Sequence, residues 1–144
     1  MEGIRGNKTL SGTWGELWID GEKILEFSKI EIKVTVNRED VQLGIDVDSK
    51  MTGLKGEGSY VVKKVYTRAK SALEKLKKGI DVRSEIIAKL EDPDAVGGQI
   101  ERWSCDNVWH NEIPVVNWEK GGIIEEEQTI GFTPSDLQNL DAIA

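Results

Sequence analysis

The residues best suited to covalent chemistry lie close together in the C-terminal third of the chain. Ser104, Cys105 and Asp106 are consecutive, and the only histidine, His110, follows shortly after them. A thiol or hydroxyl beside a histidine can serve as nucleophile and base, as a small hydrolase would require. Such partners are brought together by the fold and not by adjacency in the sequence. We therefore expect the histidine to be structural or solvated and the chain not to be an enzyme.

Two acidic runs contain residue types that bind metal ions. Asp46 and Asp48 begin like a calcium-binding loop, but Lys50 occupies the place of the third oxygen ligand. Residues 125–127 are three glutamates within a predicted strand, where adjacent side chains point to opposite faces and do not converge on one ion. We expect neither run to bind a metal, and we expect no cofactor.

A glycine-rich run from Gly53 to Gly58, with a further glycine at position 56, could suggest phosphate binding. A phosphate site uses the free amides and the dipole at the start of a helix. This run leads into a predicted strand instead, so we expect no nucleotide site there.

The chain has five tryptophans in strand-rich regions: Trp14, Trp18, Trp103, Trp109 and Trp118. A carbohydrate-binding β-sandwich module would present such rings as stacking platforms for sugars, and this is the alternative function. Large aromatic residues also fill the core or the subunit contacts of β-proteins, which is the interpretation we favour. Loss of glycan binding on replacing Trp103 or Trp109, with the fold intact, would support the alternative.

The composition indicates one acidic, soluble domain. The chain has 144 residues, a net charge of −7, 38% hydrophobic and 31% charged residues, and one cysteine. Such a chain is poorly suited to gripping nucleic acid, because lysine and arginine supply most of the affinity for phosphates, although DNA could pass it without sticking. No run approaches the roughly twenty apolar residues that span a bilayer. We expect synthesis in the cytoplasm and no membrane anchor.

Two alternating strands enclose the most distinctive segment. Over Lys29–Asn37 apolar and polar residues alternate, which is typical of a strand with one buried face. The apolar face holds Ile30, Ile32, Val34 and Val36, and the polar face holds Lys29, Glu31, Lys33 and Thr35. A second strand is predicted over Gly58–Tyr66.

About twenty residues, 38–57, join these strands, whereas compact hairpins use loops of roughly two to five residues. The connection is polar and contains several glycines, so few of its residues could help to fill a core. Its apolar side chains favour a partner surface over solvent. We interpret it as an extended, protruding loop that reaches another chain. The residues predicted for this contact are Asp46, Asp48, Lys50, Met51, Leu54 and Lys55.

The remaining elements are one helix and further strands. Thr67 is placed to cap a helix over Arg68–Lys78, and Gly79 fits a Schellman end. Asp20-Gly21 predicts a tight hairpin turn. The other predictions are a hairpin over 14–24, strands over 82–90, 99–108, 115–118 and 123–132, a turn over 119–122, a flexible arm over 1–12, and a tail over 133–144 that is irregular or forms a short terminal turn. This order predicts a single α+β domain, mainly β, built as an antiparallel sandwich or barrel with one outer helix.

Three segments, which together cover nearly the whole chain, resemble one protein family. They are Leu10–Glu22 (LSGTWGELWIDGE), Lys50–Tyr60 (KMTGLKGEGSY) followed by Val65–Arg68 (VYTR), and Ile124–Thr133 (IEEEQTIGFT). They are similar to the opening hairpin, the entry to the helix and the final strand of the tail tube (core tail) proteins of contractile phages and R-type phage-tail-like bacteriocins. The type VI secretion tube protein is more distant kin.

The resemblance implies a structural role. It implies a β-sandwich or barrel of which six copies close into a ring, with rings stacked as a hollow tube inside a contractile sheath. Sheath, baseplate and tape-measure proteins would be the further partners, and contraction would drive the tube through a target envelope. Such a protein would be made in the bacterial cytoplasm and would become a component of a phage tail or bacteriocin particle.

Sheet edges and charge agree with such an assembly. Pairing with a neighbouring subunit removes an unpaired edge, and a head-to-tail contact that closes makes a ring. The arm over 38–57 would cross to the next ring. Six copies at −7 give about −42 per ring, a sizeable field if the charge lines the channel. The candidate lumen-facing residues are Lys29, Glu31, Lys33, Glu85 and Lys89.

Overall fold

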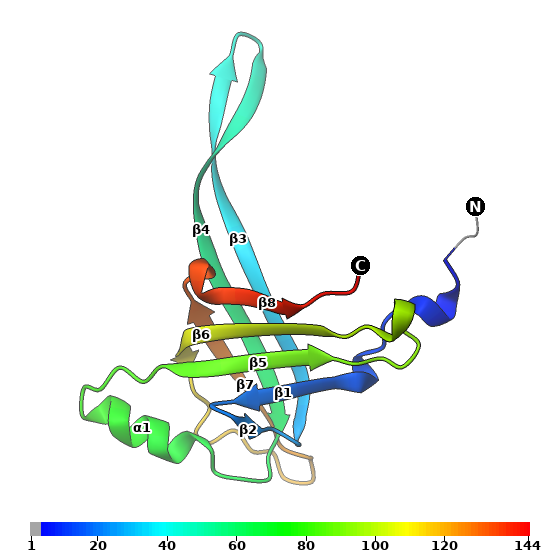
Figure 1. Ribbon diagram of the computed structural model, residues 1–144. Coiled ribbons are helices and arrows are strands. Elements are labelled where there is room, and N and C mark those ends of the chain that lie inside the picture. The colour runs from blue at the N-terminus through cyan, green and yellow to red at the C-terminus, as the bar shows by residue number, and fades with distance from the viewer. Residues whose placement is uncertain (1–3) are drawn as a thin grey trace.

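The computed structural model, which describes residues 4–144, consists of two crossed β layers with one helix at the side (Figure 1). The strands are β1 (Gly15–Ile19), β2 (Glu22–Lys23), β3 (Phe27–Leu43), β4 (Asp46–Lys63), β5 (Ser84–Leu90), β6 (Glu101–Glu112), β7 (Glu125–Phe132) and β8 (Leu137–Asp141). The α-helix is α1 (Ala69–Lys77). The predicted α+β, mainly antiparallel fold is confirmed, but the sheet does not close into a barrel.

Strand β6 belongs to both layers. Its first part pairs with β5 and β8, and from Trp109 onward it pairs with β7. Asn107, whose φ is 55°, lies at this change of partner, as expected where a strand bends between crossed layers. We call β2-β1-β5-β6-β8 the front layer and β6-β7-β4-β3 the back layer, following Figure 1.

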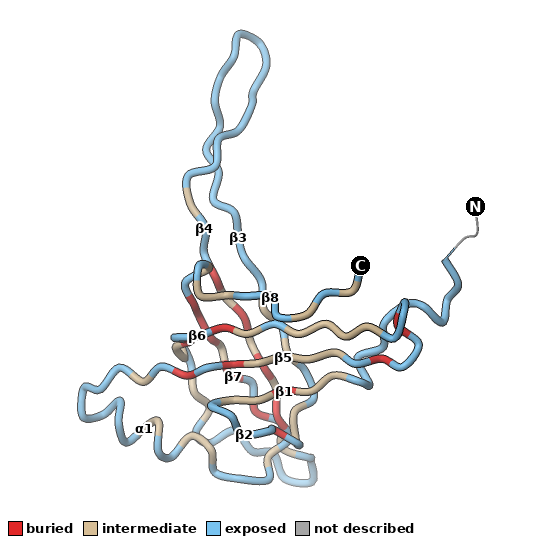
Figure 2. Tube along the Cα trace, in the orientation of Figure 1, coloured by how far each residue is buried: buried red, intermediate tan, exposed pale blue. Residues whose placement is uncertain are grey.

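The core lies between the two layers and is built from alternate positions of their strands. Leu17 and Ile86 come from the front layer, Cys105 from the shared strand, and Ile130 and Phe132 from the back layer. All five are fully buried, and the buried segments in Figure 2 follow these crossings. Because strand side chains alternate, the positions between them form the two outer faces of the sandwich.

Local turn chemistry agrees with the sequence at two places. Asp20 and Gly21 have φ values of 51° and 81° in the turn between β1 and β2. After α1, the amide of Gly79 donates to the carbonyl of Leu76 (3.0 Å) and that of Ile80 to Lys75 (3.1 Å), as in a Schellman motif. Both predictions are confirmed. The predicted helix cap is wrong: Thr67 lies outside the helix, and the residue at the cap position, Arg68, makes no capping bond.

Three other predicted segments differ in the structure. Residues 115–118 form no strand; they lie in the connection between β6 and β7, where they find no sheet edge to pair with. Residues 133–144 begin with a short turn at Pro134–Asp136, but they also contain a strand that was not predicted: β8 pairs with β6, and its Leu137 packs on the core. Of the predicted arm over 1–12, the first three residues lie outside the described chain, and the amide of Ser11 is bonded to Asp92 (2.9 Å).

The predicted protrusion of residues 38–57 is present (Figure 1), but these residues form paired strands and not a loop. β3 and β4 continue as paired strands as far as Leu43 and Asp46, and the turn contains Gly44 with a φ of 66°. Polar residues in these strands interrupt the apolar alternation by which a strand is recognised in a sequence. Within residues 4–144, no helix is long and apolar enough to cross a membrane.

Candidate assembly surfaces

Strands β3 and β4 extend far beyond the rest of the back layer (Figure 1). Their pairing reaches Leu43 opposite Asp46, whereas β7 pairs with β4 only as far as Gly56. Residues 35–55 therefore pair with no third strand of the described chain, and we call them the distal hairpin. Every residue in it is exposed except the half-buried Gly53 (Figure 2).

The distal hairpin exposes many apolar side chains. Ile45, in the turn, is 99% exposed. The others are Val36, Val41, Leu43, Val47, Met51 and Leu54. An isolated two-stranded ribbon is only marginally stable in water, and apolar side chains gathered on an exposed segment mark a contact surface. The distal hairpin thus has the composition of a contact surface.

All six residues predicted for the inter-ring contact lie on the β4 strand of the distal hairpin and are exposed. Asp46, Asp48 and Lys50 occupy alternate positions, so they share one face of the ribbon. A register shift leaves Thr52 without a partner on β3. This bulge places Met51 and Leu54 together on the other face, which continues the core-facing side of the strands.

Two glycines mark the point where the distal hairpin joins the sandwich. A Cβ atom at Gly56 would lie 2.5 Å from the ring of Phe132, and one at Gly58 would clash with the backbone carbonyl of Glu31. Close packing therefore accounts for these two glycines of the glycine-rich run.

Three predicted lumen residues, Lys29, Glu31 and Lys33, lie on the outer face of the back layer. Ile30 and Ile32, which alternate with them, pack against the core. Glu57 lies opposite Lys33, and the Lys33 ammonium is 3.5 Å from Glu31. Small side chains, Ser59 and its partner Thr129, continue this face onto β4 and β7.

The other two predicted lumen residues, Glu85 and Lys89, lie on the outer face of the front layer, because Ile86 between them is buried. A row of charged side chains crosses four strands of this face: Glu16, Lys89, Arg102 and Asp141. The two outer faces are opposite sides of the sandwich. A single channel wall therefore cannot contain all five predicted lumen residues.

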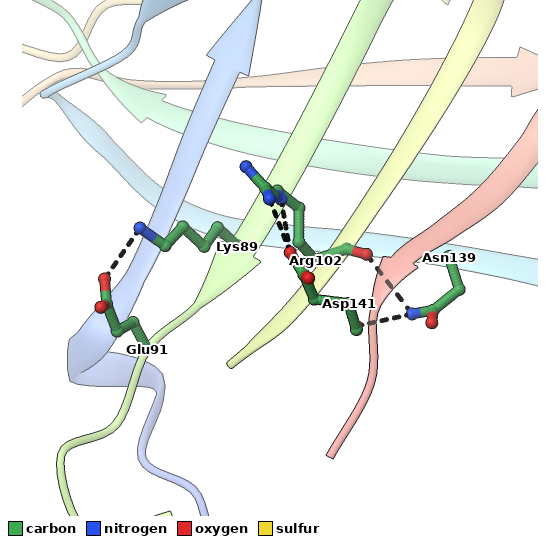
Figure 3. Close-up of polar contacts among 5 residues, drawn as sticks. All are labelled: Lys89, Glu91, Arg102, Asn139 and Asp141. Carbon is green, nitrogen blue, oxygen red and sulfur yellow. Dashed lines mark hydrogen bonds and ion pairs between the residues drawn. The ribbon is translucent and has the colours of Figure 1, made fainter. Parts of the chain in front are cut away.

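Ion pairs on the front face hold β8 against β6 (Figure 3). Arg102 Nη2 is 2.6 Å from Asp141 Oδ2, and Asn139 Nδ2 donates to the backbone carbonyls of Arg102 (3.3 Å) and Asp141 (2.9 Å). Lys89 Nζ lies 2.8 Å from Glu91, and this hydrogen bond raises the pKa of Lys89. Exposed pairs contribute little stability individually, so the role of the Arg102–Asp141 pair is to fix the position of the last strand.

Glu85 lies among other carboxylates on the same face. Its carboxyl group shares a hydrogen bond with Asp106, which raises the pKa of Glu85 above the ordinary value, and the charge of Asp20 adds to the effect. Asp20 also accepts the backbone amide of Glu85 (2.9 Å). The front face near the β1–β2 turn is therefore locally acidic.

The residues considered for covalent chemistry do not form a nucleophile–base pair. Cys105 is 1% exposed, and burial raises the pKa of its thiol to about 11, which leaves it protonated and unreactive. His110 Nε2 is 2.8 Å from the hydroxyl of Tyr60, and burial lowers the pKa of His110. His110 thus packs as a structural residue at the end of the core.

A cleft of about 270 Å³ separates α1 from the sandwich and is lined in part by His110, Tyr60 and Arg68. Arg68 forms ion pairs with Glu26 and, at 3.3 Å, with Glu22. Desolvation by burial raises the pKa of Glu26, but the hydrogen bond from Arg68, a backbone hydrogen bond and the charge of Arg68 together lower it overall. These polar contacts attach the start of α1 to the β2–β3 turn.

The acidic runs are arranged as strands. Glu126 is buried and pairs with Lys64 (3.2 Å), whereas Glu125 and Glu127 are exposed, so the predicted alternation is confirmed. Among residues 4–144, no group of three or more His, Cys, Asp or Glu residues is arranged to hold a metal ion.

None of the five tryptophans belongs to the buried core, so the predicted core role is wrong; their role in subunit contacts stays a prediction. Three of them are engaged by separate local partners. The Arg83 guanidinium lies 4.7 Å from the ring centroid of Trp109, the Lys23 ammonium 5.8 Å from that of Trp18, and Trp103 donates to Glu101 (2.9 Å). This scatter gives no support to a shared sugar-stacking platform.

Solved structures with this fold include chains of an extracellular contractile injection system, PVC, and of the anti-feeding prophage. A chain of the PVC sheath/tube terminator in its extended state has a TM-score of 0.71 at 9% identity, covering 93% of this chain and 96% of that one. A chain of the PVC sheath-tube complex in the extended state gives 0.63 at 10% identity, covering 94% and 93%. A chain of the anti-feeding prophage cap gives 0.65 at 10% identity, covering 98% and 97%.

No curated protein matches the chain. The family model described as phage tail tube protein matches residues 2–141, which is nearly the whole chain. A match over nearly the whole chain shows the family. The chain belongs to the phage tail tube protein family and is a structural protein, not an enzyme.

Proposed function

We propose that the chain is the repeating subunit of the inner tube of a contractile injection apparatus, in a phage tail or a phage-tail-like bacteriocin. The observation that carries this proposal is the distal hairpin, whose exposed apolar side chains have no cover in the described chain. A paired hairpin that leaves the sandwich along its own strands suits a contact between stacked rings. The tube would act passively when a sheath contracts and drives it through a target envelope.

Six copies would close into a ring through the edges of the back layer. β3 pairs only with β4, and residues 109–112 of β6 pair only with β7, within the part of the chain that the structure describes. These two opposite edges present backbone groups that can accept a strand from another chain. A contact from one edge to the other is head to tail, and such a contact forms a ring where its rotation closes.

We place the outer face of the back layer on the lumen. The four strands of this layer would continue from copy to copy around the bore. Its outer face carries charges of both signs, including Lys29, Glu31 and Lys33, beside the small side chains of Ser59 and Thr129. Such a wall would let DNA or a tape-measure protein pass without binding. The front face, with Glu85 and Lys89, would then point outward.

The further partners follow by analogy with the structural neighbours. The structural neighbours include chains in the PVC sheath-tube complex and in the anti-feeding prophage baseplate. We expect a sheath protein around the tube and a baseplate at one end. A tape-measure protein would occupy the lumen during assembly.

Electron microscopy of the concentrated protein tests the tube proposal. We expect hexameric rings or stacked tubes in negative stain. Single subunits at high concentration, over a range of salt concentrations, would contradict it.

A matched pair of serines tests which face lines the lumen. Ser59 lies on the outer face of the back layer and Ser104 on that of the front layer. In assembled tubes, a bulky polymer-linked maleimide should label Ser104→Cys and spare Ser59→Cys, while unassembled subunits of both variants should react. Wild-type protein is the control, because Cys105 is buried. Labelling of Ser59→Cys in tubes, with Ser104→Cys protected, would reverse the assignment.

A further inference from the structure

The end of the sandwich opposite the distal hairpin carries a second group of uncovered apolar side chains. Three connections meet there: β2 to β3, β4 to α1, and β6 to β7 (Figure 1). Backbone hydrogen bonds join them, from Lys63 to the carbonyl of Glu26 and from Lys64 to that of Ile124, both 2.9 Å. Each connection exposes large apolar residues. We define the base patch as Leu25, Val65, Val116, Trp118 and Ile123.

The base patch and the tip of the distal hairpin lie at opposite ends of the same two strands. β3 begins at Phe27, close to Leu25, and ends at Leu43 beside the turn. At about 3.3 Å per residue the strand separates the two ends by roughly 50 Å. Complementary surfaces at opposite ends of one molecule associate head to tail, and where no rotation closes the contact they build an open-ended stack.

The charges of the two ends are also complementary. Residues 39–48 contain four carboxylates and no lysine or arginine, whereas residues 63–78 contain seven lysines or arginines and one glutamate. Arg68 and Lys64 form internal ion pairs, but the remaining five, all lysines, are exposed. With the connections 20–26 and 113–125 included, the base end has nine basic and six acidic residues. Attraction between such ends fixes their relative orientation.

We propose that the tip of the distal hairpin, residues 39–48, docks on the base patch of a copy in the adjacent ring. This inference rests on the proposed tube function and adds the receiving surface. Ile45 and its apolar neighbours would cover Trp118 and Ile123, which are 62% and 83% exposed. The carboxylates of the tip would lie toward the lysines between β4 and α1.

Three variants test the pairing. The tip variant carries Leu43→Ser, Ile45→Ser and Val47→Ser; the base variant carries Val116→Ser, Trp118→Ser and Ile123→Ser; and the control carries Val96→Ser and Leu140→Ser, which are exposed elsewhere. We expect the tip and base variants each to form rings. In each variant the association constant for ring stacking should fall by about 100-fold. The control should stack like wild type.

Mixing the two variant rings gives the decisive result. A base-variant ring keeps an intact tip and a tip-variant ring keeps an intact base, so the mixture should form paired rings and nothing longer. Single rings in the mixture, or full tubes from the base variant alone, would overturn the receiving surface while leaving the tube function in place. A wild-type protein that forms no rings would instead refute the tube function itself.

Hydroxyl-radical footprinting provides a second test that needs no change in the base patch. Trp118 should be oxidised several-fold more slowly in wild-type tubes than in rings of the tip variant. Equal oxidation in both would overturn the proposal. It would show that the base patch is covered by another part of the assembly, such as an N-terminal segment, or is not covered.

Discussion

The two halves of the β3–β4 ribbon follow the same backbone rules but differ in what covers them. In the half within the sandwich, Ile30 lies opposite Tyr60 and Ile32 opposite Gly58, and both isoleucines pack against the core. In the distal hairpin, Val36 continues the same face of β3 but is exposed. Strand pairing therefore extends beyond the core, whereas burial within the chain stops where β7 ends.

The difference also separates two kinds of stability. The covered half belongs to the cooperative fold of the subunit, because its side chains leave water when the sandwich forms. The distal hairpin gains almost nothing from the subunit's own core. Its apolar side chains become buried only when another molecule covers them, so changes there should affect assembly far more than folding.

Shortening the ribbon should have the largest effect on assembly. Replacing residues 38–52 with an Asn-Gly turn would join Asn37 to Gly53, which already pair. We expect the melting temperature of the subunit to stay within a few degrees of wild type, as for a change of less than about 1 kcal/mol in the unfolding free energy. Stacked tubes should disappear from electron micrographs. Loss of the native circular dichroism spectrum would mean that the distal hairpin is part of the fold.

A pair of large-to-small substitutions should separate the two halves by folding energy. Phe132 is buried against the covered half, whereas Val47 is exposed on the distal hairpin. Denaturant unfolding should show a loss of about 3–5 kcal/mol for Phe132→Ala and of at most about 0.5 kcal/mol for Val47→Ala. Equal losses would remove the distinction.

Two glycines on the same strand sharpen the boundary. A Cβ at Gly56 would press on the Phe132 ring, whereas a Cβ at Gly53 would meet no atom within 4 Å. Gly56→Ala should lower the unfolding free energy by about 1–3 kcal/mol through overpacking. Gly53→Ala should leave it unchanged or raise it by up to about 1 kcal/mol. A Gly56→Ala variant as stable as wild type would show that the boundary packing is loose.

The smallest effect should come from pH and be confined to the covered half. Burial lowers the pKa of His110 below its ordinary 6.5, so between 6.5 and its folded value the unfolded chain takes up a proton that the folded chain does not. The unfolding free energy should therefore fall as the pH drops below 6.5. His110→Gln should lack this component, and the NMR titration of this single histidine should have its midpoint below 6.5. A midpoint at or above 6.5 would contradict the burial.

The sequence predicted the covered parts of the fold well, because alternation and turn chemistry are local. The Asp20-Gly21 turn, the end of α1 at Gly79 and the β3 strand inside the sandwich follow from spacing alone. β8 was missed because Gln138 and Asn139 are polar and pair with β6 only through the tertiary fold. The strand predicted over 115–118 has the right composition but no neighbouring edge.

The candidate surfaces were predicted less completely. The six residues of β4 predicted for the inter-ring contact were chosen because they lie in a long polar segment, and their contact stays a prediction. The pairing of the two strands was not predicted, because Asp40, Gln42 and Asp46 interrupt the apolar residues. A local signal existed in Gly44, which follows the apolar residues of one strand and precedes those of the next. Exposure on the base patch could not be inferred, since Trp118 or Ile123 would read equally well as core. The sequence also could not show that Lys33 and Lys89 lie on opposite outer faces, because this depends on how the two layers pack.

Hydrogen exchange measured by mass spectrometry, on single subunits and on assembled tubes, tests most directly whether another copy completes the distal hairpin. Peptides from residues 38–52 should exchange quickly in the subunit and become strongly protected in the tube, because only assembly covers them. Peptides from β7, residues 125–132, should be protected in both states and serve as the internal reference. Equal exchange of the distal hairpin in subunit and tube would contradict the claim that it is an assembly surface.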